Sequence, residues 1–424
     1  MAASMTSTLE GQYLLVAGGK EKRGKYKYNP DSHEVCDADD ASKIFGTFCF
    51  DPVSMSGPPP LAFPPGNAPD PCIRIVDSEI IGEIQKPENS GAYFCLPSQF
   101  NGAEYPSERS IVKEIERYKF DNTGGPRGQL AVHPAAGQFV LDNAASDDNP
   151  GGINAIDVLV AGTEKFGFRL VNGYLSVPKR RETKDQDAAM EVLMRDAHTL
   201  RPLVMKGVPA CGLNPGKRAF CKEVHRVNLV YASAVPVQSY MNMADESETP
   251  FQVNVAELMA IVQYYGALKC AADDAAAGKI EAMKANPFVE GSADGGGPPP
   301  PPGPAEAAPG DGAIGGGAMP PSGGGGADAP AIGGAPTPEG PVKAKVFLMP
   351  LGGGVFNNPW ESIARCMCVA TEMLTAEEKA LLDIGVLTWN GNPMESDKMT
   401  TLLRKHNKLR APERAAGTGG AIGA

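Results

Sequence analysis

The residue types with the clearest chemical meaning in this chain are three glycines at 352–354, which lie between an apolar run and a helix start. Apolar residues 346–351 predict a buried strand, and the glycines let the backbone turn tightly and approach a bulky ligand. Asn358 suits an N-cap and Pro359 the first helical position. A helix start behind glycines offers free N–H groups and a positive dipole end, which favour a phosphate or diphosphate. A tight strand-to-helix turn without a ligand is the alternative.

A second glycine-rich segment, residues 118–131, carries groups that recognise a ribose or an amide. It follows a short strand that ends in the amides Gln99 and Asn101. Ligands of open α/β sheets bind outside the carboxyl ends of the strands, so two glycine-rich loops there indicate a nucleotide-sized cleft. The alternative is that residues 121–125 form only a turn, in which Asp121 shapes the loop.

Four segments, in this order, resemble macrodomain-like proteins related to ADP-ribose-binding modules and poly(ADP-ribose) glycohydrolases. They are residues 98–101, 121–128, 169–174 and 352–359. The resemblance spans residues 91–390 without the insertion described below. It implies an α/β fold with a macrodomain-like mixed sheet flanked by helices. It also implies that the partner is ADP-ribose or an ADP-ribosylated protein.

The resemblance implies a role for ten ligand-binding residues. Asn101 would bind the distal ribose, residues 123–125 would approach the diphosphate or that ribose, and residues 352–356 would wrap the diphosphate. The ten residues are Asn101, Thr123, Gly124, Gly125, Gly352, Gly353, Gly354, Val355, Phe356 and Asn357. The chain departs from the glycohydrolases in one place: no paired glutamates follow the first glycine loop, and Gln129 stands nearby instead.

Three functions are therefore expected in order of preference. The first is binding of ADP-ribose or a related nucleotide diphosphate. The second is an ADP-ribosyl hydrolase or glycohydrolase that uses Asp121 as its catalytic carboxylate. The third is a structural or scaffolding protein with a degenerate cleft. No cofactor is expected, and no metal either, because Cys211, Cys221 and His225 lack a C-x-x-C pair.

Composition limits the classes of partner. The net charge of -11 argues against binding to a nucleic-acid backbone or an anionic membrane. No apolar run reaches the roughly 18 residues of a membrane span, and the N-terminus lacks the pattern of a secretory signal. Nine scattered cysteines fit reduced thiols. The expected location is the cytoplasm, with the nucleus as the alternative.

The chain divides into four parts by composition. Residues 291–341 hold 17 Gly and 13 Pro and predict a disordered insertion, whose proline run suits a protein contact or a plain spacer. Residues 1–90 are expected to form an N-terminal extension packed on the core. Residues 91–290 and 342–410 would form the α/β domain, and 411–424 a disordered tail.

Hydrophobic periodicity predicts the elements of that domain. Downstream, the order strand, helix, strand, helix, strand implies parallel strands with right-handed crossovers. The expected strands are residues 13–16, 44–50, 73–76, 93–96, 224–232, 346–351 and 384–389, with two strand pieces in 168–177 around an Asn-Gly turn. The expected helices are residues 107–118, 185–197, 253–283 and 358–374.

Overall fold

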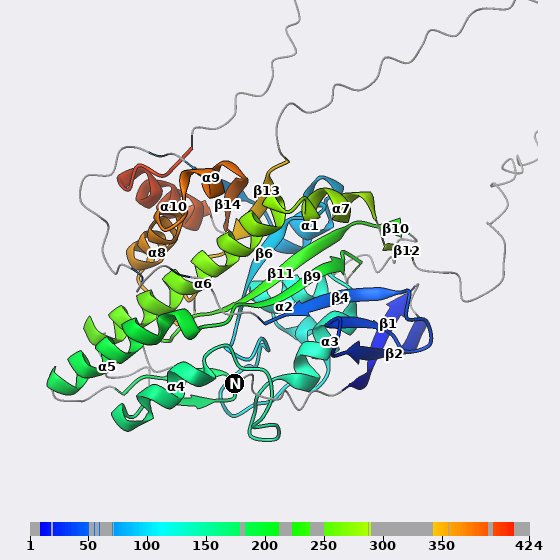
Figure 1. Ribbon diagram of the computed structural model, residues 1–424, viewed down its shortest axis with the longest axis horizontal. Helices are drawn as coiled ribbons and strands as arrows, with labels where there is room; N and C mark the ends of the chain where they lie inside the picture. The colour runs from blue at the N-terminus through cyan, green and yellow to red at the C-terminus, as the bar shows by residue number, and fades with distance from the viewer. Residues whose placement is uncertain are drawn as a thin grey trace, which may run out of the picture. The chain divides into compact units, whose positions relative to one another are not determined.

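The structure is a computed structural model, and a ten-stranded mixed sheet is its main element (Figure 1). It describes residues 9–17, 20–50, 55, 59, 70, 72–178, 183–211, 223–237, 250–286, 288–289, 342–354, 356–388 and 393–410. In spatial order the strands are β1 (Glu10–Ala17), β2 (Lys20–Asn29), β3 (Glu34–Asp37), β4 (Ile44–Cys49), β9 (Leu203–Pro209), β11 (Arg226–Ser233), β6 (Tyr93–Ser98), β13 (Ala344–Leu348), β14 (Leu382–Thr388) and β5 (Ile73–Asp77). From β11 to β5 every neighbouring pair is parallel, and from β1 to β11 every pair is antiparallel.

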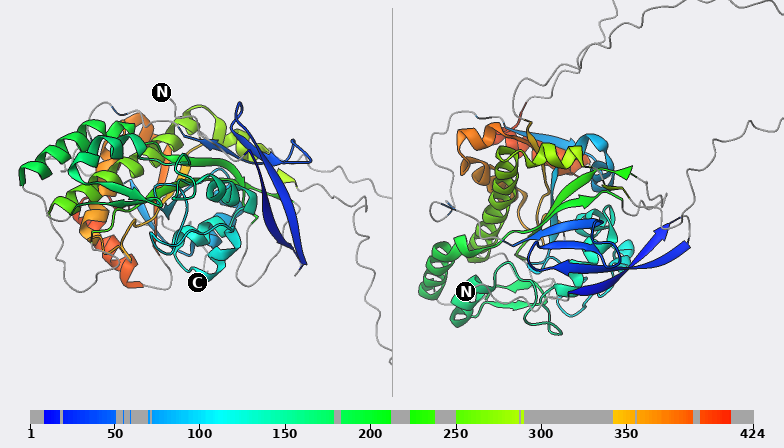
Figure 2. Two further views of the ribbon diagram at one scale, coloured as in Figure 1. Left: turned by 90° about the horizontal axis from the view of Figure 1, so that it is seen from below. Right: turned by 45° about the vertical axis from the view of Figure 1, so that its right-hand side comes forward.

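Helices cover both faces of this sheet, so the predicted mixed α/β fold with a flanked sheet is confirmed. One face packs against α6 (Pro250–Ala276), α8 (Trp360–Glu372) and α10 (Pro393–Lys405). The other packs against α1 (Ile80–Gln85), α2 (Gly124–Leu130) and α3 (Pro134–Asn143), as Figure 2 shows from two further sides. Tyr93 and Cys95 of β6 enter one core and Phe94 and Leu96 the other, as expected of a central strand buried on both faces.

The remaining elements lie around the sheet. They are α4 (Asp157–Thr163), α5 (Thr183–Asp196), α7 (Lys279–Ala285) and α9 (Ala376–Ala380), with two small antiparallel pairs, β7 (Arg169–Val171) with β8 (Tyr174–Ser176) and β10 (Glu223–Val224) with β12 (Phe288–Val289). Short 3-10 helices lie at Pro87–Asn89, Ile115–Phe120, Glu164–Phe166 and Ala197–Thr199. No helix in the described part of the chain is long and apolar enough to cross a membrane.

Most predicted elements are confirmed, and the predicted parallel order of β11, β13 and β14 is present. β6 lies between β11 and β13, which local sequence does not reveal. The Asn-Gly turn joins β7 to β8, with positive φ at Asn172 and Gly173. The single helix expected over 253–283 is two helices, because the chain breaks at Gly278, whose φ is 68°.

Two local predictions are wrong. The helix expected over residues 107–118 is irregular chain that ends in the short 3-10 helix. Gln138 of α3 explains this, because its side chain accepts from Ile115 N (3.1 Å) and donates to Lys113 O (2.8 Å). Asn358 is not the N-cap of α8: the helix begins at Trp360 after Pro359, and Asn358 is buried instead.

The first 90 residues supply strands to both edges of the sheet. β4 pairs with β9, which joins β1–β4 to one side, and β5 pairs with β14 at the other edge. The predicted insertion, 291–341, and the predicted tail, 411–424, lie outside the described residues.

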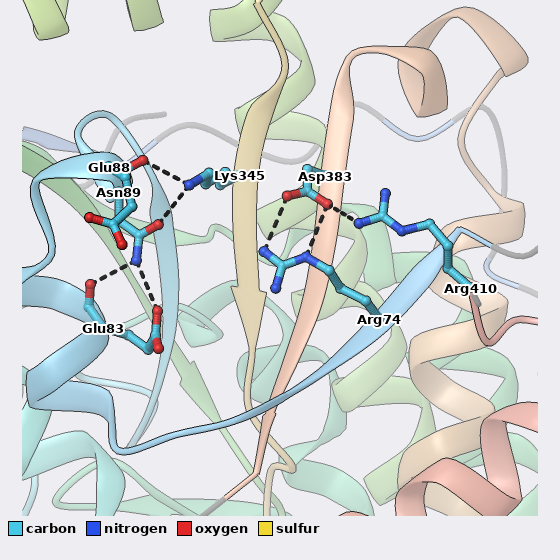
Figure 3. Close-up of polar contacts among 7 residues, drawn as sticks. All are labelled: Arg74, Glu83, Glu88, Asn89, Lys345, Asp383 and Arg410. Atoms are coloured by element: carbon cyan, nitrogen blue, oxygen red, sulfur yellow. Dashed lines mark hydrogen bonds and ion pairs between the residues drawn. The ribbon is translucent and has the colours of Figure 1, made fainter. Parts of the chain in front are cut away.

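The amino ends of β5, β13 and β14 hold a network of polar contacts (Figure 3). Asp383 of β14 accepts from Arg74 of β5 (3.1 Å) and from Arg410 (2.7 Å). Burial alone would raise the pKa of Asp383, but the two guanidinium groups outweigh it and lower that pKa. Lys345 of β13 donates to Asn89 Oδ1 (3.0 Å). These groups satisfy one another, and the glycine-rich segments lie at the opposite end of the strands.

Candidate functional site

The two glycine-rich segments meet at the carboxyl ends of the neighbouring parallel strands β6 and β13. The first begins α2 at Gly124, and the second starts directly after β13 with Met349. A Cβ added at Gly124 would lie 2.3 Å from Met349 Cε, so the two segments are in direct contact. The ligand position of an open α/β sheet is at this end of the strands.

The first segment needs glycine because α2 approaches β6 very closely. A Cβ at Gly125 would lie 1.8 Å from Pro97 O and 2.4 Å from Glu104 Oε1. Thr123 precedes the helix as its N-cap residue, and its side chain makes no capping hydrogen bond. At Gly125, therefore, packing of the helix on the strand end already explains the residue type, whatever ligand is bound.

Asp121 shapes the loop before α2. Its Oδ1 accepts from Thr123 N (2.8 Å) and from Thr123 Oγ1 (2.6 Å), which is an Asx turn. The alternative interpretation of residues 121–125 as a turn therefore matches the local geometry. The carboxylate remains partly exposed at the mouth of the site.

Glu104 is a candidate residue to which sequence analysis gave no role. Gln99 Nε2 donates to its Oε2 (3.2 Å), and its backbone N–H donates to Tyr118 Oη (2.6 Å). Burial raises the pKa of the Glu104 carboxyl well above its usual range, the negative charge of Asp121 raises it further, and the Gln99 hydrogen bond offsets only part of this. Two carboxyl groups with different environments thus lie beside the first glycine segment. The sequence signal that could have identified Glu104 is an acidic residue three positions after Asn101, in a loop with several amide side chains.

Asn101 and Gln129 do not face the site. Asn101 is fully buried: its Nδ2 donates to Ala145 O (2.8 Å) and its Oδ1 accepts from Ala103 N (3.1 Å). Gln129 is also fully buried, and its Nε2 donates to Gly102 O (3.4 Å). The amide that was expected to bind a ribose holds backbone loops together in this structure.

The second segment contains glycines in three different surroundings. Gly352 has a φ of +75°, and a Cβ there would lie 2.5 Å from Asn358 Nδ2. A Cβ on Gly353 would lie 3.2 Å from Trp360 and Ile363 side-chain atoms. At Gly354 no described atom lies within 4 Å of that position, so this face of the loop is open.

The remaining residues of the second segment continue the turn. Val355 lies outside the described residues, and Asn357 has a φ of 51°. The Phe356 ring lies 6.1 Å from that of Tyr174 in an edge-on arrangement. Phe356 therefore brings the second glycine segment against the β7–β8 hairpin.

Two tyrosines fix these loops. Tyr174 Oη donates to Tyr105 O (2.6 Å) and accepts from Gln99 Nε2 (3.2 Å), which ties the hairpin to the loop after β6. Tyr264 of α6 donates its hydroxyl proton to Met349 O (2.7 Å) and accepts from Leu351 N (2.9 Å). No role was predicted for either hydroxyl group, because these contacts join segments that are distant in the sequence.

A small pocket at the ends of β5 and β14 extends the site. Glu79, Arg127, Met349 and Thr388 are among its lining residues. Arg127 Nε donates to Glu79 Oε1 (2.7 Å). Thr388 Oγ1 is fully buried and has no hydrogen-bond partner among the described residues, so a polar ligand atom or a water can satisfy it.

Other titratable candidates are structural. His133 stacks on Phe45 with ring centroids 4.1 Å apart, and burial lowers its pKa to about 3. Within the described ranges, no three His, Cys, Asp or Glu side chains form a group that could hold a metal ion.

Comparisons of the chain with protein-family models, curated proteins and solved structures found no match.

Proposed function

We propose that this chain binds ADP-ribose or a related nucleotide diphosphate at the carboxyl ends of β6 and β13, in a macrodomain-like fold. The observation that carries the proposal is the contact between the two glycine-rich segments at Gly124 and Met349. The support for the fold is that three of the resembling segments touch, through Gly173 with Asn101 and Phe356 with Tyr174, and that Gly125 of the fourth approaches Pro97 directly before the first.

The chemistry of the site suits an anionic, ribose-containing ligand. The open face of Gly354 gives a diphosphate access to backbone N–H groups, and the positive end of the α8 dipole begins at Trp360. Because its pKa is raised, Glu104 keeps its proton to a higher pH than an ordinary glutamate and repels a diphosphate less. The Phe356–Tyr174 pair offers an aromatic edge to a ribose or base.

Isothermal titration of the purified chain with ADP-ribose, and with ADP, NAD and ATP for comparison, tests the proposal. We expect saturable binding that is tightest for ADP-ribose. The variant Gly354→Glu, which places a carboxylate on the open face, should abolish it without changing the melting temperature. No heat of binding with any nucleotide would contradict the proposal and favour the scaffolding alternative.

One observation favours hydrolysis as a second candidate function. Glu104 and Asp121 form a pair of carboxyl groups, of which the first has a raised pKa and the second is partly exposed. In such a pair the first carboxyl can donate a proton to a leaving group while the second acts as the base that activates water. Release of ADP-ribose from a modified protein should then be lost in both Glu104→Gln and Asp121→Asn. Release that survives both substitutions would exclude this candidate.

A further inference from the structure

A larger pocket lies behind the loop that follows β6. Its volume is about 730 Å³, which is within the range of about 300–1,000 Å³ typical of ligand sites. Its walls come from the loop that includes residues 145–150, from α4 (labelled in Figure 1) and from the β7–β8 hairpin. None of the residues that line this pocket was predicted to bind a ligand.

The loop after β6 joins this pocket to the candidate nucleotide site. Phe100 N–H donates to Gly173 O (3.0 Å), and Phe100 O accepts from Ala155 N (2.8 Å). Asn101 Nδ2 donates to Ala145 O (2.8 Å). Gly173 and Ala145 both line the pocket. One side of the loop therefore bears Glu104 and Gln99 of the nucleotide site, and its backbone and Asn101 hold the walls of the pocket.

The opening of the pocket is fixed by Asn172. Its Oδ1 accepts from Asp147 N (2.9 Å) and its Nδ2 donates to Glu108 O (2.7 Å). Asn172 also has a φ of 47°, so the hairpin turn and the 145–150 loop are held in one arrangement. A pocket whose walls are tied by hydrogen bonds is formed before a ligand arrives.

The lining favours a cation with an aliphatic stem. The lining holds three carboxylates, Asp147, Asp157 and Glu164, and one guanidinium, Arg169. Ala161 and Leu170 also line the pocket and are not fully buried, so they give it an apolar floor. A lysine or arginine side chain can lay its methylenes on such a floor and direct its charge to the carboxylates. The excess of negative charge disfavours a phosphate at this position.

We propose that this pocket binds a basic polypeptide segment, the one that carries the nucleotide held on the other side of the loop. The inference that this segment carries the nucleotide rests on the proposed function. The preference of the pocket for a chain that contains lysine or arginine rests only on the charge of its lining. A modified protein would then be recognised at two adjacent places, its nucleotide at the glycine segments and its basic side chains here.

The test uses the full chain and a fluorescent peptide of alternating lysine and glycine. Fluorescence polarisation measures the affinity of this peptide for the wild type and for the double variant Asp157→Asn with Glu164→Gln. The control is a double variant with the same change of charge at exposed positions of α9 and α10, Glu377→Gln with Asp397→Asn. We expect the first pair to weaken binding by about three- to tenfold at low salt, as for partly exposed ion pairs. The control pair should leave it unchanged. If the double variant does not fold, the single variant Glu164→Gln replaces it in the comparison with the wild type.

The same three proteins are titrated with free ADP-ribose. Unchanged ADP-ribose affinity alongside weakened peptide binding supports two separate sites. Equal peptide affinity in the double variant and the control, or no peptide binding by the wild type, would overturn the pocket assignment. If ADP-ribose binds none of the proteins while peptide binding still depends on the pair, the proposed nucleotide function fails and the basic-peptide site stands.

Discussion

Substitution of single glycines by alanine separates packing from ligand access in the two glycine-rich segments. Gly125 lies in α2, where alanine is the better helix former by about 1 kcal/mol. Helix propensity alone therefore predicts that Gly125→Ala stabilises the chain. The contacts predict the reverse, because the new Cβ would lie 1.8 Å from Pro97 O and 2.4 Å from Glu104 Oε1.

The size of the effect follows from the overlap. Since real Cβ contacts are essentially never under 3.0 Å, α2 and the end of β6 must separate by at least about 1.2 Å. Overpacking of this kind costs about 1–3 kcal/mol or more. Each kcal/mol lowers the melting temperature by about 2–4 °C in a domain of 150–250 residues. Gly354→Ala meets no described atom within 4 Å and should change stability by less than about 0.5 kcal/mol.

Chemical denaturation and thermal unfolding of both variants, with nucleotide titration on the same samples, measure these effects. We expect Gly125→Ala to unfold several degrees below the wild type. Gly354→Ala should keep its stability and bind ADP-ribose more weakly, because its methyl group projects into the open face. A Gly125→Ala variant as stable as the wild type, or more stable, would refute the packing argument.

Three further predictions concern single polar groups. Because the pKa of Glu104 is raised in the folded state, its contribution to stability is full below its unfolded pKa, near pH 4, and is lost as pH rises above that value. Glu104→Gln should therefore gain stability relative to the wild type as pH rises above about 4, by up to about 1.4 kcal/mol for each pH unit. A difference that does not change with pH, measured by urea unfolding, would exclude this cause. The lowered pKa of Asp383 has the opposite sign: Asp383→Asn should destabilise the chain above about pH 4 and converge with the wild type in acid, as urea unfolding at several pH values would show. Tyr264→Phe strands Met349 O and Leu351 N and should cost about 1–3 kcal/mol in urea unfolding, and an unchanged midpoint would mean that the hydroxyl does not hold the loop.

The strands were the part of the fold that sequence predicted best. Residues 93–96 and 346–348 are short apolar runs that form strands buried on both faces, although the strand predicted over 346–351 ends at Leu348. Residues 224–232 alternate as a strand does, and β11 covers 226–233. Their spatial order depends on contacts between distant segments, so the position of β6 between β11 and β13 was not predictable. The N-terminal strands β1–β5 show the same limit, since their pairing partners decide where they lie in the sheet.

Only those parts of the candidate site that depend on glycine backbone conformation could be predicted from the sequence. Glycines at 124–125 and 352–354 mark close approach and tight turns, and Gly124 does contact Met349, three residues before the second group of glycines. The helix predicted over residues 107–118 is absent for a long-range reason: the Gln138 side chain forms hydrogen bonds with Ile115 N and Lys113 O. The raised pKa of Glu104 arises from burial in the folded chain, which no local pattern contains.

The most direct test of the nucleotide site is ¹³C-methyl NMR of the methionines during a titration with ADP-ribose. Met349 begins the second glycine segment, contacts Gly124 of the first and lines the small pocket at the ends of β5 and β14. Met367 and Met399 are buried in the core on the far face of the sheet. We predict a saturable shift of the Met349 methyl signal, assigned with Met349→Leu, and no shift of the Met367 and Met399 signals. A titration that leaves the Met349 signal unmoved would contradict binding at this site.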